Sequence, residues 1–179
     1  MSLDERSALL VIDLQQATLA NPTVHPVADI VANARALADG FRASGRTVVL
    51  ATVTGTPAGR TTYGGGAREY PAELTAVTPD LGAQESDIRV ARSTWSAFAG
   101  TALDETLRAA GVTQVVLVGV ATSFGVESTA RAAYDLGYSV LVVTDAVTDL
   151  RAEAHENSVT RVFPVLAETT ATADVLADL

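Results

Sequence analysis

Short apolar runs recur along the chain, at residues 8–13, 47–53, 88–92, 114–120 and 139–145. The first, fourth and fifth of these runs are almost unbroken Leu, Ile and Val, without the alternation of a half-exposed strand. Such runs are typical of strands that are covered on both faces in a parallel sheet. We therefore expect five strands, of which the first, fourth and fifth are buried on both faces, with a last short extended piece near residues 168–172.

Helical periodicity fills most of the segments between these runs. Residues 27–44 carry apolar side chains at a spacing near 3.6 and end at Gly45, which is a helix stop signal. Similar segments, each followed by a glycine or a proline, are 101–110, 126–136 and 151–163. The alternation of strand and helix predicts a doubly wound α/β fold: a mostly parallel six-stranded sheet flanked by helices in a Rossmann-like three-layer sandwich, with residues 1–179 in a single domain.

The segment 54–84 fits neither pattern, because it is rich in Gly, Pro and Thr. A loop of this length in a compact domain is more often functional than idle. Arg60, Tyr63 and Arg68 lie in it, and they can be interpreted either as a lid that meets an anionic ligand or as solvated loop side chains.

Composition narrows the classes of function. Hydrophobic residues make up 48% of the chain and charged residues 18%, as in a globular core, and the net charge is −9. This charge and the absence of a basic cluster argue against nucleic acid as a partner. The longest apolar stretch, 115–121, is too short to span a bilayer, and the first residues lack the layout of a signal peptide, so we expect no membrane association and a cytoplasmic location.

Two residue types are missing from the sequence. There is no cysteine, which excludes disulfides, thiolate metal sites and a cysteine nucleophile together. There is no lysine either, since all twelve basic residues are arginine. An arginine can therefore stand where a lysine is expected, either for function or through a coding bias.

Candidate chemistry lies at the ends of the predicted strands, because ligands of open α/β sheets bind beyond the carboxyl ends of the strands. Asp13 ends the first run, where partial burial suits a carboxyl to acid–base work, or where it caps a turn or pairs with an arginine. Arg92 ends the third run and can bind an anion, or be a strand-edge charge. Gly125 lies near the start of the helix after the fourth run, where backbone N–H groups can stabilise an oxyanion, or where close packing requires glycine.

Several motifs together resemble the isochorismatase-like superfamily of cysteine hydrolases. They span essentially the whole chain in the family's order: Val11–Gln15, Arg92–Leu103, Gly119–Arg131, Leu136–Tyr138, Val143–Ala146, the helix with His155, and Phe163-Pro164. In cysteine-hydrolase members the catalytic residues are Asp, Lys and Cys. At the matching positions this chain has Asp13, Arg92 and Gly125, so the acid alone is retained and a thioester route is excluded.

The resemblance also implies further parts of a site. A non-proline cis peptide is expected between Val120 and Ala121, with the N–H groups of Ala121 and Gly125 forming the oxyanion hole. The expected substrate-binding residues are Gln15, Trp95, Phe98 and Ser123. The residues alone also allow strand-end packing for Gln15, core or interface roles for the two aromatic side chains, and capping for Ser123.

The favoured function is that of an isochorismatase-type hydrolase for a small carboxylated metabolite. Asp13 would protonate the substrate without a covalent thiol intermediate, and Arg92 would hold the substrate's carboxylate. We expect no metal and no cofactor, because the segment 51–60 has no His or acid and the only histidines, His25 and His155, lack partners at ligand spacing. The resemblance implies a homodimer or homotetramer. The alternatives are an inactive family member that binds a metabolite or partner, and an interaction protein that only oligomerises.

Overall fold

A computed structural model describes residues 3–179 and confirms the predicted fold class. Its central sheet has six strands in the order β10-β9-β8-β1-β2-β7, and every pair is parallel. These strands are β1 (Ser7–Ile12), β2 (Thr47–Val53), β7 (Ile88–Arg92), β8 (Gln114–Val120), β9 (Ser139–Thr148) and β10 (Glu168–Thr170). The strand order reverses at β1, because the chain builds outward through β2 and β7 and then returns to β8 on the other side. Ligand crevices of open sheets form at such a switch point.

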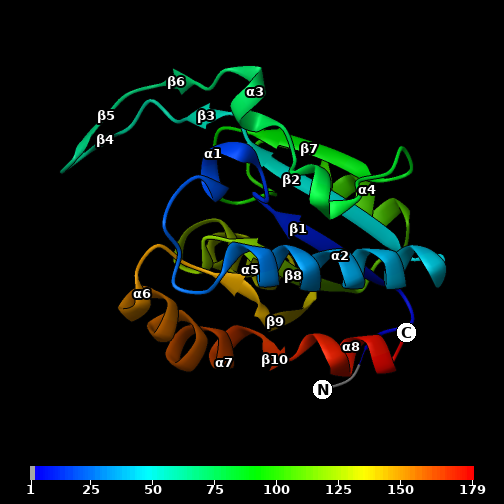
Figure 1. The fold of residues 1–179 in the computed structure, drawn as a ribbon. Helices are drawn as coiled ribbons and strands as arrows, with labels where there is room; N and C mark the ends of the chain where they lie inside the picture. Colours follow the sequence, from blue (N-terminus) through cyan, green and yellow to red (C-terminus); the bar gives the residue numbers. More distant parts are fainter. Residues whose placement is uncertain (1–2) are drawn as a thin grey trace.

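Helices cover both faces of this sheet and complete three layers (Figure 1). On one face α2 (Val27–Ala43) and α8 (Thr172–Ala177) bury apolar side chains such as Phe41. On the other, α4 (Leu103–Ala109) and α5 (Glu127–Asp135) bury side chains such as Leu107. The side chains of β1 alternate between the two clusters, so all six of its residues are buried. This double covering is the reason for its unbroken apolar run.

Two of the predicted helices contain a wider π turn. The helix expected at 126–136 begins four residues earlier, with η2 (Thr122–Val126) leading into α5. The helix expected at 151–163 is built from α6 (Ala152–Asn157), η3 (Ser158–Val162) and α7 (Phe163–Leu166). Within residues 3–179 no helix has the length and apolar character that crossing a membrane requires.

The loop predicted at 54–84 contains a hairpin arm and two short helical turns. Two small antiparallel ladders form the arm: β3 (Gly55–Thr56) pairs with β6 (Arg68–Glu69), and β4 (Arg60–Thr61) pairs with β5 (Gly64–Gly65). The arm projects from the body (Figure 1), and Tyr63 near its tip is 95% exposed. Near its base, α1 (Gln16–Leu19) from the segment after β1 lies against α3 (Ala72–Thr75), and η1 (Pro79–Leu81) packs on α2.

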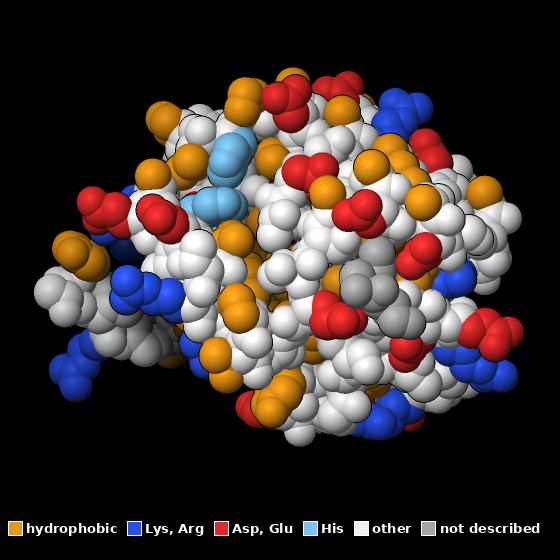
Figure 2. All heavy atoms as spheres, turned by 90° about the horizontal axis from the view of Figure 1, so that it is seen from below, with side chains coloured by type: hydrophobic (Ala, Val, Ile, Leu, Met, Phe, Trp, Pro, Cys, Tyr) orange, Lys and Arg blue, Asp and Glu red, His pale blue; other side chains and the backbone are white. Residues whose placement is uncertain are grey.

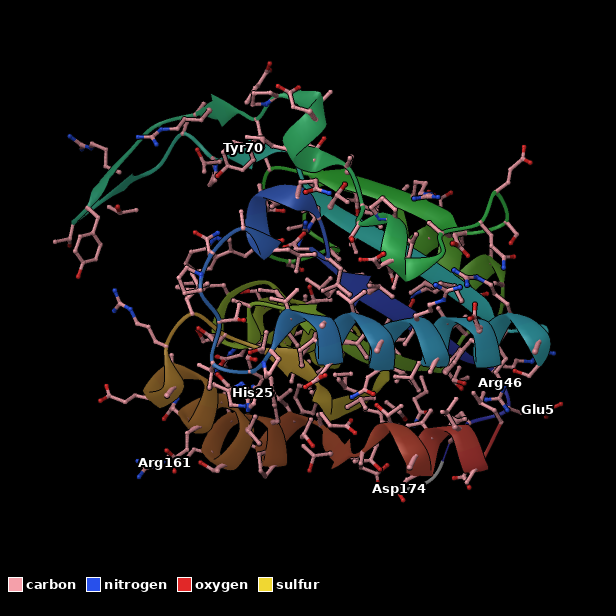
Figure 3. All side chains as sticks on the ribbon, viewed as in Figure 1. Glu5, His25, Arg46, Tyr70, Arg161 and Asp174 are labelled. Carbon is pink, nitrogen blue, oxygen red and sulfur yellow. The ribbon has the colours of Figure 1, made fainter. Side chains whose placement is uncertain are left out.

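Two histidines that lie far apart in the sequence meet on the face that carries α6. The rings of His25 and His155 contact each other edge to face with their centroids 4.7 Å apart, and Figure 2 shows them side by side. Figure 3 places His25 beside the ribbon of α6. Each ring nitrogen Nδ1 lies within hydrogen-bond distance of a threonine hydroxyl, Thr148 for His25 and Thr122 for His155. The pair therefore joins the segment before α2 to the start of the helix that carries Gly125.

Glycine is required at the point where β8 lies against β1. Gly119 has a φ of +123°, and a Cβ atom there would lie 2.0 Å from the carbonyl oxygen of Ile12. The pairing of β8 with β9 also shifts register between Leu117 and Gly119. Because only glycine permits this close approach, it brings the carboxyl ends of β1 and β8 together.

Candidate active site

Asp13 directly follows β1 in an uncommon backbone conformation. Its φ is +52°, in the left-handed region that non-glycine residues rarely adopt. Backbone hydrogen bonds hold it there: its N–H donates to Ala51 O (2.9 Å), and its carbonyl oxygen accepts from Gln15 N–H (2.9 Å) and from the Thr18 hydroxyl. Such outliers cluster at functional sites, where the surrounding structure must hold one side chain in one direction.

The carboxylate of Asp13 forms a buried, bidentate ion pair with Arg92. The two bonds run from Nη1 to Oδ1 (2.7 Å) and from Nη2 to Oδ2 (2.9 Å), and the residues are 6% and 4% exposed. Nη2 also donates to Trp95 O at 3.0 Å, while Nε is buried without a partner in the described part of the chain. Burial raises the pKa of Asp13 above its ordinary value of 3.8, and the hydrogen bonds and charge of Arg92 limit that rise.

Gly125 lies in η2, one turn after the peptide bond between Val120 and Ala121, which is cis as the resemblance implied. A Cβ atom at position 125 would lie 2.9 Å from Ile12 Cγ2, 3.0 Å from Asp13 Oδ2 and 3.5 Å from Arg92 Nη2. The first two distances are shorter than, or at the limit of, ordinary carbon contacts. The ion pair and Ile12 therefore leave no room for a side chain at the position where the resemblance implies a cysteine in cysteine hydrolases.

This crowding predicts the effect of a single methyl group. We expect Gly125→Ala to lower the free energy of unfolding by about 1–3 kcal/mol, as overpacking does in tightly packed sites. Gly59→Ala is the matched control, because a Cβ atom there has no neighbour within 4 Å. Chemical denaturation of both variants measures the difference. Equal stability of the two would contradict the contact distances around position 125.

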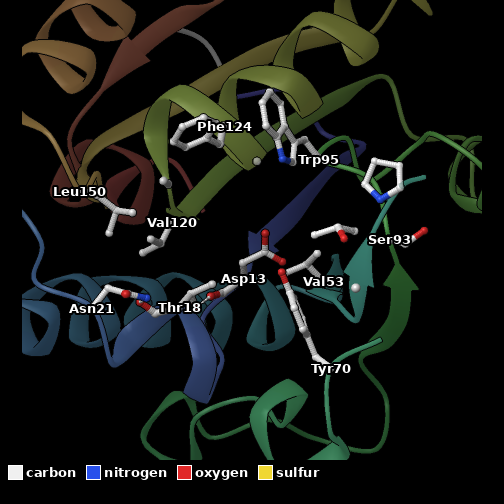
Figure 4. Close-up of a pocket in the computed structure, with 15 residues that line it drawn as sticks. Asp13, Thr18, Asn21, Val53, Tyr70, Ser93, Trp95, Val120, Phe124 and Leu150 are labelled. Atoms are coloured by element: carbon white, nitrogen blue, oxygen red, sulfur yellow. Dashed lines mark hydrogen bonds between the residues drawn. The ribbon is translucent and has the colours of Figure 1, made fainter. Parts of the chain in front are cut away.

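A cavity of about 190 Å³ opens beside this pair, at the carboxyl ends of β1, β2 and β8 (Figure 4). Trp95 and Phe124 form part of its wall, with their ring centroids 4.9 Å apart at an angle of 64°. None of the described residues around the cavity is Arg, Lys or His. The lining residues are Asp13, Thr18, Asn21, Val53, Gly55, Thr56, Pro57, Tyr70, Ser93, Trp95, Val120, Ala121, Phe124, Gly125 and Leu150.

The structure places Asp13, Trp95, Val120, Ala121 and Gly125 together at this cavity. Arg92, expected to clamp a substrate carboxylate, is hydrogen-bonded within the protein in this structure. Both terminal nitrogens of the guanidinium group already donate hydrogen bonds, Nη1 to Asp13 and Nη2 to Asp13 and Trp95 O. Arg92 is not among the residues that line the cavity. No cation is among the described residues that line the cavity, and the carboxylated substrate stays a prediction.

Three residues expected to bind substrate are not among the residues that line this cavity: Gln15, Phe98 and Ser123. Gln15 is fully buried, and its side-chain amide bonds the backbone of Val53 (2.8 Å in both directions) and Leu74 O (3.3 Å), so it pins β2 and α3 to the end of β1. Phe98 is 8% exposed in the core, where it stacks on Tyr138. Ser123 does not line the cavity. Strand-end packing and a core aromatic were the alternatives that the sequence left open for the first two.

One buried acid near the site was missed at the sequence level. Asp149 is fully buried and accepts N–H groups from Ser123 (2.7 Å), Leu150 (2.7 Å) and Arg151 (3.2 Å). It thereby ties the start of the helix with Gly125 to the segment after β9. The sequence signal for such a residue is an acid directly after a strand, and Asp149 directly follows the end of β9. The predicted strand stopped at residue 145, whereas β9 continues to Thr148.

Tyr70, Thr18 and Asn21 also line the cavity without having been singled out. They come from segments that carry no strand-end signal, so only the folded chain brings them to Asp13. The described residues contain no group of three or more His, Cys, Asp or Glu side chains placed to hold a metal ion.

A doubly wound parallel sheet with a buried acid and a cavity at its switch point defines the class of this protein as an α/β protein with a candidate active site at the carboxyl ends of its strands. Residues 7–174 match the sequence family described as Isochorismatase domain. YwoC, an uncharacterized isochorismatase family protein of Bacillus subtilis, is 34% identical over 96% of this chain and 93% of its own. The chain therefore belongs to the isochorismatase family.

A solved structure agrees over the full length. An isochorismatase family protein from Burkholderia thailandensis superposes with a TM-score of 0.95 at 37% identity, covering 99% of this chain and 97% of that chain. Over shorter segments the chain is also similar to proteins that are named as enzymes. Ureidoacrylate amidohydrolase RutB of Variovorax paradoxus is 42% identical over 67 residues, which is 37% of this chain and 27% of that protein.

Proposed function

We propose that this protein is a hydrolase in which Asp13 is the acid–base group and water is the nucleophile, without a covalent thiol intermediate. The observation that carries the proposal is the buried Asp13–Arg92 pair beside an open cavity in a chain without cysteine. A cavity of about 190 Å³ suits a small substrate. An open cavity also favours a ligand-binding role over a role in oligomerisation alone.

We propose a separate task for each member of the site. Arg92 fixes the direction of the carboxylate and keeps it ionised, so Asp13 is proposed to accept a proton from water as that water attacks the substrate. A raised pKa makes the carboxylate a better base than an exposed aspartate, and it can return the proton to the leaving group. The N–H groups of Ala121 and Gly125, both cavity residues, are the proposed donors to the developing oxyanion.

The pH dependence of turnover tests this assignment. We expect activity on a panel of small neutral amides to rise with pH through the pKa of Asp13, because the ionised form is the base. Since that pKa is raised, the rise should lie above pH 3.8. Activity that falls as pH rises through the same range would assign the protonated acid role to Asp13. Saturable binding of panel members without any turnover would favour the inactive, ligand-binding alternative.

The resemblance also leads us to propose a homodimer or homotetramer. Sedimentation equilibrium of the full chain measures the mass directly, and a monomer at all concentrations would contradict this proposal.

A further inference from the structure

The cavity carries an unusual amount of exposed apolar surface. Trp95 is 58% exposed, Phe124 is 42% exposed and Leu150 is 46% exposed, and all three line the cavity. Exposed large apolar side chains that gather at one concave site mark a ligand-binding surface. The edge-to-face arrangement of Trp95 and Phe124 leaves flat ring surface for an apolar group of a ligand.

The electrostatics of the cavity disfavour an anion. The one charged residue among its described lining is Asp13, and its charge is balanced by Arg92 on the side away from the cavity. A ligand carboxylate beside Asp13 would meet a like charge, without a cation of its own in the described wall.

Tyr70 supplies a hydrogen-bond donor at this apolar wall. It follows β6 at the base of the arm (Figure 3), and its N–H donates to Thr54 O at 2.8 Å, which holds the residue against β2. Figure 4 shows its ring extending into the site with the hydroxyl directed toward Asp13. In the described part of the chain this hydroxyl has no hydrogen-bond partner. Tyr63, on the same arm, points into solvent and does not line the cavity.

We infer that Tyr70 is a specificity-determining residue for an uncharged substrate. Its hydroxyl donates a hydrogen bond to an oxygen of the reacting group beside Asp13, while a flat apolar part of the substrate lies against Trp95 and Phe124. The inference rests on the proposed function, because it takes the Asp13 side of the cavity as the reacting end. The arm then has a role in substrate binding, because Tyr70 lies at its base and its hydroxyl is directed into the cavity.

The test measures binding, so its outcome is independent of turnover. Trp95 is the only tryptophan of the chain, and its fluorescence therefore reports on this cavity alone. The probes are benzamide and benzoate, which have the same size and differ in charge. We expect saturable quenching by benzamide and at least about tenfold weaker binding of benzoate. Tyr70→Phe should weaken benzamide binding about three- to tenfold, as loss of one neutral hydrogen bond does, and Tyr63→Phe should leave it unchanged.

Several results would overturn the inference. These are equal binding of benzoate and benzamide, no saturable quenching by benzamide, and equal effects of Tyr70→Phe and Tyr63→Phe. Asp13→Asn provides a further check, because removing the negative charge should bring benzoate closer to benzamide. The expected binding pattern in a protein that turns over no panel member would reject the proposed catalytic function and keep Tyr70 as a residue that binds an uncharged ligand.

Discussion

Asp13→Asn is expected to lower turnover by about 10²- to 10⁴-fold while the protein stays folded, which is the range that a positioned acid–base group contributes. Asparagine keeps the size of the side chain and can still accept one hydrogen bond from Arg92. It cannot take a proton from water, so the proposed base is lost. Turnover of the best panel substrate, measured beside a thermal melt, separates a loss of catalysis from a loss of structure.

The chain contains a matched control for this substitution. Asp87 and Arg42 form a second bidentate pair, with Nε–Oδ1 at 2.9 Å and Nη2–Oδ2 at 2.8 Å, and the Asp87 side chain is 1% exposed. Asp87 precedes β7, at the end of the sheet away from the cavity, and does not line it. Asp87→Asn should lower the free energy of unfolding by about as much as Asp13→Asn does, and it should leave turnover near that of wild type. Similar losses of turnover in both variants would mean that the effect at Asp13 is structural.

Arg92→Met is expected to lower the free energy of unfolding by about 3–5 kcal/mol at neutral pH, because it leaves the Asp13 carboxylate buried without its partner. Methionine fills much of the space of the arginine stem, so packing accounts for little of this loss. Urea denaturation measures it. Arg89→Met on the same strand is the control: Arg89 is exposed and makes one long hydrogen bond, to Gln84 O at 3.3 Å, so we expect a change within about 0.5 kcal/mol.

The pH dependence of this variant has a definite sign. Without Arg92, burial is the dominant influence on Asp13 and raises its pKa further, so the folded state binds a proton more tightly than the unfolded state does. Stability is then present at low pH and is lost as pH rises through the folded pKa. The free energy of unfolding of Arg92→Met should therefore lie further below that of wild type at pH 8 than at pH 5. A difference in free energy of unfolding that becomes smaller with rising pH would show that Asp13 is not the buried charge left without a partner.

Much of the fold follows from local sequence. The unbroken runs at β1, β8 and β9 indicate burial on both faces, and the glycine after three of the helical segments sets where those helices end. The strand positions at Asp13 and Arg92 are local facts as well, so both residues were found. The arm and the full length of β9 escaped prediction, because short ladders rich in glycine and a strand with polar residues near its end carry weak patterns.

The sequence by itself determined the fold class, the family resemblance, the absence of a thiol and the acid at the end of β1. Only the tertiary structure decided what Arg92 does, because its partner lies 79 residues away and meets it across β2. The tertiary structure also decided the role of Gln15, because its side-chain amide forms hydrogen bonds with backbone groups of β2 and α3. It likewise decided the position of Tyr70, which lies at the cavity because the base of the arm packs there. A side chain's chemistry is fixed locally, but its role depends on which neighbours satisfy its hydrogen bonds, and those neighbours are set by packing.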